Sequence, residues 1–133
     1  MVGGYIDHTM MRVEDREESV SWYREMLDWE VHREVEMATF DLIFVGPPDA
    51  DADDHLVELT YNHPDEDGPR SYEMGDAWGH VAVAVDDVDE AYAELMDRGV
   101  EDYRDPESCG GHYAFVRDPD GHEIELVERE LDG

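Results

Sequence analysis

The alternation of apolar and polar residues predicts one strand, one helix and three further strands in the first half of the chain. The helix follows Asp15, whose side chain is placed to cap it, and Glu18 is the capping-box partner three residues later. Its apolar residues recur at helical spacing and therefore share one face. The strands are predicted at 6–13, 31–36, 39–45 and 55–61, and the helix runs through 19–27.

The second half repeats this order of elements. Asp87 caps a second helix, and Gly99 supplies the position after its end. A βαβββ module that occurs twice gives the α+β fold class, in which each helix covers one face of its sheet. Here the strands are predicted at 80–85, near 100–103, at 113–116 and at 123–128, around a helix at 88–98.

Matched residues indicate that the two halves arose by duplication. His8 and His80 lie 72 positions apart, and "FVGPP" matches "FVRDP" at an offset of 71. "HLVEL" and "HEIEL" match at an offset of 67, and the shared order of these matches indicates a duplicated module. We expect one domain over residues 1–133, made of a first repeat (about 5–62), a linker (63–76) and a second repeat (about 77–130).

The composition is strongly acidic, because 38 Asp and Glu residues against 9 basic ones, all arginine, give a formal charge of −29. Such a chain repels nucleic acids and anionic lipid surfaces, so neither is expected as a partner. Hydrophobic residues make up 41% of the chain in regular patterns, which argues against disorder. A folded core under an acidic surface is typical of a halophile, and we expect the melting temperature to rise with added KCl, because salt screens the carboxylate repulsion. A melting temperature that does not rise would contradict this hypothesis.

Cysteine usage and the N-terminal sequence predict the compartment. A single cysteine, Cys109, excludes an intramolecular disulfide and fits a reducing environment. The first ten residues have neither the basic nor the apolar region of a signal peptide. No apolar run approaches the roughly 18 residues of a membrane span. A soluble, cytoplasmic protein is the expectation.

Four polar residues occupy equivalent positions on the predicted strands of the two repeats. His8 and Glu58 in the first repeat correspond to His80 and Glu125 in the second, on faces that alternate with the apolar core residues. A buried carboxylate without a partner is costly, and two imidazoles with two carboxylates suit a divalent ion that keeps room for water. The same residues also suit a solvated acidic surface with ordinary surface histidines. The face pattern alone leaves both interpretations open.

At these residues the chain resembles glyoxalase I (lactoylglutathione lyase), a family of the vicinal-oxygen-chelate superfamily. The resemblance covers nearly the whole chain in order, and its fold is a duplicated βαβββ module with one curved mixed sheet per active site. The stretches that carry it are "HTMMRV", "SVSWYREMLDWEV", "FVGP", "VELTYN", "YEMGDAWGHVAVAVDDV" and "AFVRDPDGHEIELVE".

The resemblance implies a metal-dependent lyase. It implies that His8, Glu58, His80 and Glu125 bind one divalent metal, with Ni²⁺ or Co²⁺ favoured by the compact length and Zn²⁺ or Mn²⁺ as alternatives. It also implies a homodimer with shared active sites. The implied substrate is the hemithioacetal of methylglyoxal and a small thiol, isomerised to an S-lactoyl thioester. Glu125 is implied as the main catalytic base, and Glu58 as a base for the opposite stereoface.

Two further residues match substrate-binding positions of the family. Arg12 and Asn62 correspond to residues that hold the γ-glutamyl end of glutathione, and a guanidinium is a natural partner for that carboxylate. The chain departs from the family in the loop before "AFV", where relatives carry lysine but no basic residue lies between Arg104 and Arg117. We therefore expect a thiol without glycine, such as γ-glutamylcysteine, or weak use of glutathione.

Three other functions are compatible with this fold to different degrees. A methylmalonyl-CoA-type epimerase needs basic residues for the CoA phosphates, and the chain is poor in them. A dioxygenase uses two histidines and one carboxylate, so the fourth candidate ligand argues against it. A metal-free binding or resistance module that sequesters a drug or aromatic ligand is the non-enzymatic alternative.

Overall fold

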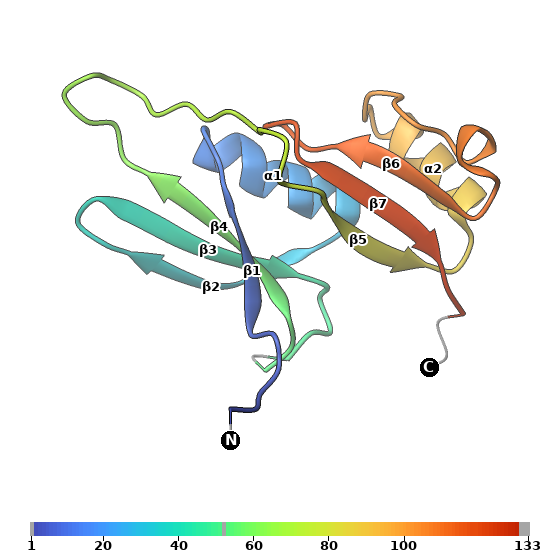
Figure 1. Ribbon diagram of the computed structural model, residues 1–133, viewed down its shortest axis with the longest axis horizontal. Coiled ribbons are helices and arrows are strands. Elements are labelled where there is room, and N and C mark those ends of the chain that lie inside the picture. The colour runs from blue at the N-terminus through green and yellow to red at the C-terminus, as the bar shows by residue number, and fades with distance from the viewer. Residues whose placement is uncertain (1, 52, 131–133) are drawn as a thin grey trace. The chain divides into compact units, whose positions relative to one another are not determined.

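The computed structural model describes residues 2–51 and 53–130, which belong to two compact units, Met1–Glu73 and Met74–Gly133 (Figure 1). The boundary between the units lies inside the predicted linker. In its described residues each unit contains one mixed sheet and one α-helix, which confirms the α+β class. None of the helices that the structure describes has the length and apolarity to span a membrane.

The first unit contains a four-stranded sheet in the order β1-β4-β3-β2. β1 pairs with β4 in parallel, and the other pairs are antiparallel. The predicted helix cap is present, because the Asp15 carboxylate accepts the Glu18 backbone N–H at 3.0 Å. The elements are β1 (His8–Arg12), α1 (Arg16–Leu27), β2 (Glu30–Glu36), β3 (Phe40–Gly46) and β4 (Leu56–Asn62).

The second unit contains a three-stranded sheet in the order β5-β7-β6. β5 pairs with β7 in parallel, and β6 pairs with β7 in the antiparallel direction. The Asp87 carboxylate caps the helix of this unit by accepting the Glu90 backbone N–H at 3.0 Å. The elements are β5 (His80–Val85), α2 (Val88–Asp97), a short 3₁₀ helix η1 (Glu107–Cys109), β6 (Tyr113–Arg117) and β7 (Glu123–Glu128).

The strand predicted near residues 100–103 is absent, and a single bridge between Arg104 and Phe115 takes its place. A side chain explains the difference. The Tyr103 backbone N–H donates to the Tyr92 hydroxyl oxygen at 2.8 Å, and that hydroxyl donates to Asp102 at 2.7 Å. Burial and the acceptor Asp102 raise the pKa of Tyr92 to about 12, so its proton stays in this hydrogen bond. These two hydrogen bonds tie residues 102–103 to Tyr92 of α2, and Arg104 exchanges backbone hydrogen bonds with Phe115 on β6.

Alternation along β1 assigns its two faces. Met11 and Val13 are buried in the core at 3% and 1% exposure, whereas His8, Met10 and Arg12 are exposed. This agrees with the predicted faces, and it leaves one side of the first sheet carrying polar and chemically reactive side chains.

A buried carboxylate connects α1 to the β2–β3 hairpin in the first unit. Asp41 accepts hydrogen bonds from Arg16 at 2.6 Å and from the His63 Nε2 at 2.9 Å, and it is 6% exposed. Burial by itself would raise the pKa of Asp41, but the hydrogen bonds from His63 and Arg16 outweigh it and hold the pKa below its ordinary value. Asp41 therefore stabilises the fold in its charged form.

The variant Asp41→Asn is expected to lower the free energy of unfolding at pH 7 by about 2 kcal/mol, because it removes a charge-assisted hydrogen bond. A lowered pKa means that this stabilisation is present above the unfolded carboxyl pKa of about 3.9 and is lost as the pH falls through the folded value. Urea denaturation in concentrated KCl between pH 2 and pH 7 measures both effects. Glu36→Gln is the control, because Glu36 contacts the same Arg16 from an exposed position and should cost less than about 1 kcal/mol.

Candidate active site

The first unit brings two of the four candidate ligands together. His8 Nε2 lies 2.9 Å from Glu58 Oε2, and the Thr60 hydroxyl donates to Glu58 Oε1 at 3.1 Å. Glu58 is 8% exposed, since β4 is buried on both faces along most of its length. The other ring nitrogen of His8 lies 2.7 Å from Asp7, which fixes the ring orientation. The glutamate among the apolar residues of β4 is thus the buried half of a His–Glu pair whose histidine is exposed.

The second unit contains the equivalent pair. His80 Nε2 lies 2.7 Å from Glu125 Oε2, and the Glu125 side chain is 18% exposed. The parallel register pairs His80 with Glu123 and Ala82 with Glu125, so the carboxylate comes from the neighbouring strand. Each unit therefore presents one imidazole nitrogen and one carboxylate from the same positions of its sheet.

A phenylalanine packs against each histidine, and this contact was not predicted. Phe44 meets the His8 ring edge-on with ring centroids 5.5 Å apart, and Phe115 meets the His80 ring edge-on at 5.1 Å. In each antiparallel pair the phenylalanine lies opposite the glutamate, Phe44 to Glu58 and Phe115 to Glu125, so the side chains share a face.

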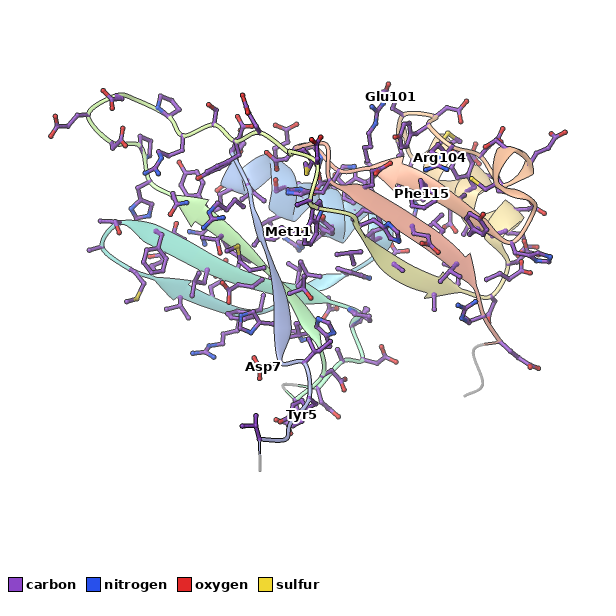
Figure 2. All side chains as sticks on the ribbon, in the orientation of Figure 1. Tyr5, Asp7, Met11, Glu101, Arg104 and Phe115 are labelled. Atoms are coloured by element: carbon purple, nitrogen blue, oxygen red, sulfur yellow. The ribbon has the colours of Figure 1, made fainter. Side chains whose placement is uncertain are left out.

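An arginine lies over each of these rings. The Cζ of Arg33 is 5.6 Å from the Phe44 centroid, and the Cζ of Arg104 is 4.5 Å from the Phe115 centroid. Figure 2 labels the second pair. The internal repeat could have identified both arginines, because Arg33 and Arg104 are separated by 71 positions, as are Phe44 and Phe115. Each unit thus carries the same set of His, Glu, Phe and Arg.

The two predicted substrate-binding residues lie at the end of the first sheet. Arg12 is the last residue of β1 and is exposed. Asn62 is the last residue of β4, and its side-chain amide donates to the Tyr72 hydroxyl oxygen at 2.8 Å. Arg12 pairs in register with Thr60, two residues before Asn62, which places both residues at the same end of adjacent strands.

A family model described as the glyoxalase/bleomycin resistance protein/dioxygenase superfamily matches residues 5–126. The chain belongs to this superfamily. It is 37% identical to the lactoylglutathione lyase of Salmonella typhimurium, covering 91% of this chain and 90% of the relative. It is also 37% identical to the lactoylglutathione lyase of Neisseria meningitidis, covering 92% and 88%. Among solved structures, the trypanothione-dependent glyoxalase I of Leishmania major matches with a TM-score of 0.80 and 36% identity, over 95% of this chain and 87% of that one.

This superfamily member also contains a cluster of potential metal ligands outside the His–Glu pairs. Asp118, Asp120 and His122 bring ligand atoms within 4.8 Å of one another in the turn between β6 and β7. Asp118 Oδ1 accepts the backbone N–H groups of Asp120 and His122 at 3.0 and 2.9 Å, and His122 Nδ1 lies 2.8 Å from Asp118 Oδ2. Burial lowers the pKa of His122, but the bond to Asp118 and its charge outweigh this and raise it. These contacts explain the cluster as the internal bonding of a tight turn.

Proposed function

We propose that the protein is a metal-dependent lactoylglutathione lyase that isomerises the hemithioacetal of methylglyoxal and a small thiol to an S-lactoyl thioester. The observation that carries this proposal is the occurrence of one His–Glu pair at the equivalent place in each unit, with nitrogen-to-oxygen distances of 2.9 and 2.7 Å. Relatives named lactoylglutathione lyase cover nearly the whole chain, which supports the same activity.

The side chains present suit a divalent metal. His8, Glu58, His80 and Glu125 would supply two imidazole nitrogens and two carboxylate oxygens, a set that fits Ni²⁺ or Co²⁺ and also Zn²⁺ or Mn²⁺. The two pairs have the same orientation, because in each one the Nε2 atom of the histidine faces a carboxylate oxygen of the glutamate. The ion would stabilise negative charge on adjacent substrate oxygens when bound.

The proton transfer is assigned to the glutamates. Glu125 would remove the proton from C1 of the hemithioacetal and return it to C2, and Glu58 would serve the opposite stereoface. Glu125 is the more exposed of the two side chains, at 18% against 10%, which favours it as the base that reaches substrate.

We further propose a cytoplasmic homodimer in which each site combines His8 and Glu58 of one protomer with His80 and Glu125 of the partner subunit. The duplication supports this assignment, because two half-sites of the same construction can complete each other by a twofold operation. Each half-site offers only two protein ligands, fewer than the three or four that catalytic and structural metal sites of this donor type use.

The substrate-binding residues that we propose for the thiol are Arg12 and Asn62, which would hold the γ-glutamyl end. The loop after Arg104 contains no lysine or arginine up to Arg117, so a glycyl carboxylate finds no cation there. Arg104, before this loop, packs on the Phe115 ring. We therefore propose γ-glutamylcysteine as the preferred thiol and glutathione as a poorer one.

Metal reconstitution tests the function directly. The chelator-treated protein receives Ni²⁺, Co²⁺, Mn²⁺ or Zn²⁺ separately in concentrated KCl, and thioester absorbance is followed with methylglyoxal and each thiol. We expect thioester formation with Ni²⁺ or Co²⁺ and a higher kcat/KM with γ-glutamylcysteine. A clear preference for glutathione would refute the choice of thiol. A protein that binds no stoichiometric metal and forms no thioester would instead be a binding module.

A further inference from the structure

Arg33 lies beside the first His–Glu pair. It is on β2 and pairs in register with Phe44, which in turn pairs with Glu58. Its Cζ lies 5.6 Å from the centre of the Phe44 ring, and the other neighbour of that ring is His8 at 5.5 Å. One aromatic ring therefore separates a guanidinium from a candidate metal ligand.

A β-bulge creates this position. The register shifts between Val31 and Arg33, so that Val31 pairs with Val45 while Arg33 pairs with Phe44. The extra residue on β2 moves Arg33 to the face that carries Phe44 and Glu58. Bulges that redirect a side chain are concentrated beside active sites, which is the situation here.

The guanidinium of Arg33 has no carboxylate within ion-pair distance in residues 2–51 and 53–130, although the chain contains 38 acidic residues. Other arginines are paired in this way, and these are Arg16, Arg70, Arg98 and Arg117. In such an acidic protein, an exposed guanidinium that packs on an aromatic ring and pairs with no carboxylate is available to bind an anionic ligand.

A cavity of about 270 Å³ surrounds this group, and its lining includes His8, Arg33 and Phe44. Asp7 and Asp54 also line it, but each already accepts a short hydrogen bond, from His8 at 2.7 Å and from the Asp51 backbone N–H at 2.7 Å. Within residues 2–51 and 53–130 Arg33 packs on a ring and makes no hydrogen bond, so its guanidinium N–H groups remain available to a ligand.

We propose that Arg33 is a specificity-determining residue that binds the cysteinyl carboxylate of the thiol substrate in this cavity. The proposal rests on the proposed lyase function. A guanidinium binds a carboxylate through two parallel hydrogen bonds. Phe44 contacts both Arg33 and His8, so it holds the guanidinium on the side of the cavity where His8 lies. The substrate class is a thiol with a free carboxylate on the cysteine itself.

Reach favours the cysteinyl over the glycyl carboxylate. In γ-glutamylcysteine the carboxylate is attached to the carbon that bears the thiol arm, so it stays near the sulfur and the metal. Glycine in glutathione converts this carboxylate into an amide and places the next one roughly 3.5 Å farther along the chain. A cation one ring away from His8 suits the shorter thiol.

Affinities of blocked thiols test the proposal without turnover. Calorimetry in concentrated KCl measures binding of S-methyl-γ-glutamylcysteine and of its cysteine amide to the metal-free wild-type protein and to Arg33→Ala. We expect wild type to bind the acid at least tenfold more tightly than the amide, and Arg33→Ala to lose about tenfold for the acid alone. Arg33→Lys should recover part of the loss, because it restores the charge without the fork. Arg24→Ala is the control, since Arg24 lies on α1 away from the cavity.

Equal affinity of wild type for acid and amide would overturn the proposal, as would an equal loss of both in Arg33→Ala. A loss confined to the acid in Arg104→Ala, with Arg33→Ala unchanged, would also overturn it and would assign the carboxylate to the second repeat. The lyase function is judged separately, by thioester formation in the metal-loaded wild type. If the metal-loaded wild type forms thioester but Arg33 makes no difference between acid and amide binding, this inference is rejected and the lyase function stands.

Discussion

Replacement of Glu125 by glutamine is expected to lower kcat/KM for thioester formation by about a thousandfold. The amide keeps the size of the side chain and a hydrogen bond to His80, which lies 2.7 Å away in the native protein, but it cannot accept the substrate proton. It is also a much poorer metal ligand, so both proposed roles of the carboxylate are lost. Steady-state kinetics with saturating Ni²⁺, together with the metal content of the purified variant, measure the two losses separately.

Glu123→Gln provides the matched control for this experiment. Glu123 lies two residues earlier on β7 and accepts the Tyr103 hydroxyl at 2.8 Å, outside the His–Glu pair. We expect its activity to stay within a few-fold of wild type. A Glu125→Gln protein that retained metal and turned over hemithioacetal normally would exclude Glu125 as the base, and full activity in Glu58→Gln combined with loss in Glu125→Gln would assign the chemistry to one glutamate.

The strand periodicity predicted the faces on which the two histidines and two glutamates lie, because that information is local. Side chains alternate along a strand, so the apolar neighbours Val57 and Leu59 place Glu58 on the opposite face without any knowledge of its partner. The internal repeat then identified the equivalent residues, and the structure shows each histidine within hydrogen-bond distance of its glutamate.

The arginines over the rings were missed for physical reasons that differ between the repeats. Arg33 follows a bulge, where simple alternation assigns a residue to the wrong face. Arg104 belongs to an isolated bridge with Phe115, next to residues that hydrogen bonds tie to Tyr92 on α2. Both failures involve contacts between different segments, which the pattern of polar and apolar residues within one segment cannot predict.

The shared dimeric site makes a second prediction with a large effect. His8→Ala and His80→Ala should each be nearly inactive as pure proteins, because every site in either homodimer lacks one metal ligand. Refolding the two variants together forms mixed dimers, in which one site carries both substitutions and the other carries none. If the chains reassort freely, half of the dimers are mixed, so the mixture should regain about a quarter of wild-type activity.

The reverse experiment distinguishes a shared site from a site within one chain. When wild type is refolded with an equal amount of the double variant His8→Ala/His80→Ala, every site in a mixed dimer lacks one histidine if the sites are shared. Only dimers of two wild-type chains then remain active, which gives about a quarter of the activity of an all-wild-type sample. Sites within one chain would instead give about half, and the two single variants would show no recovery. Mass spectrometry of isotope-labelled chains verifies that exchange has occurred, so that an absence of recovery counts against the shared site.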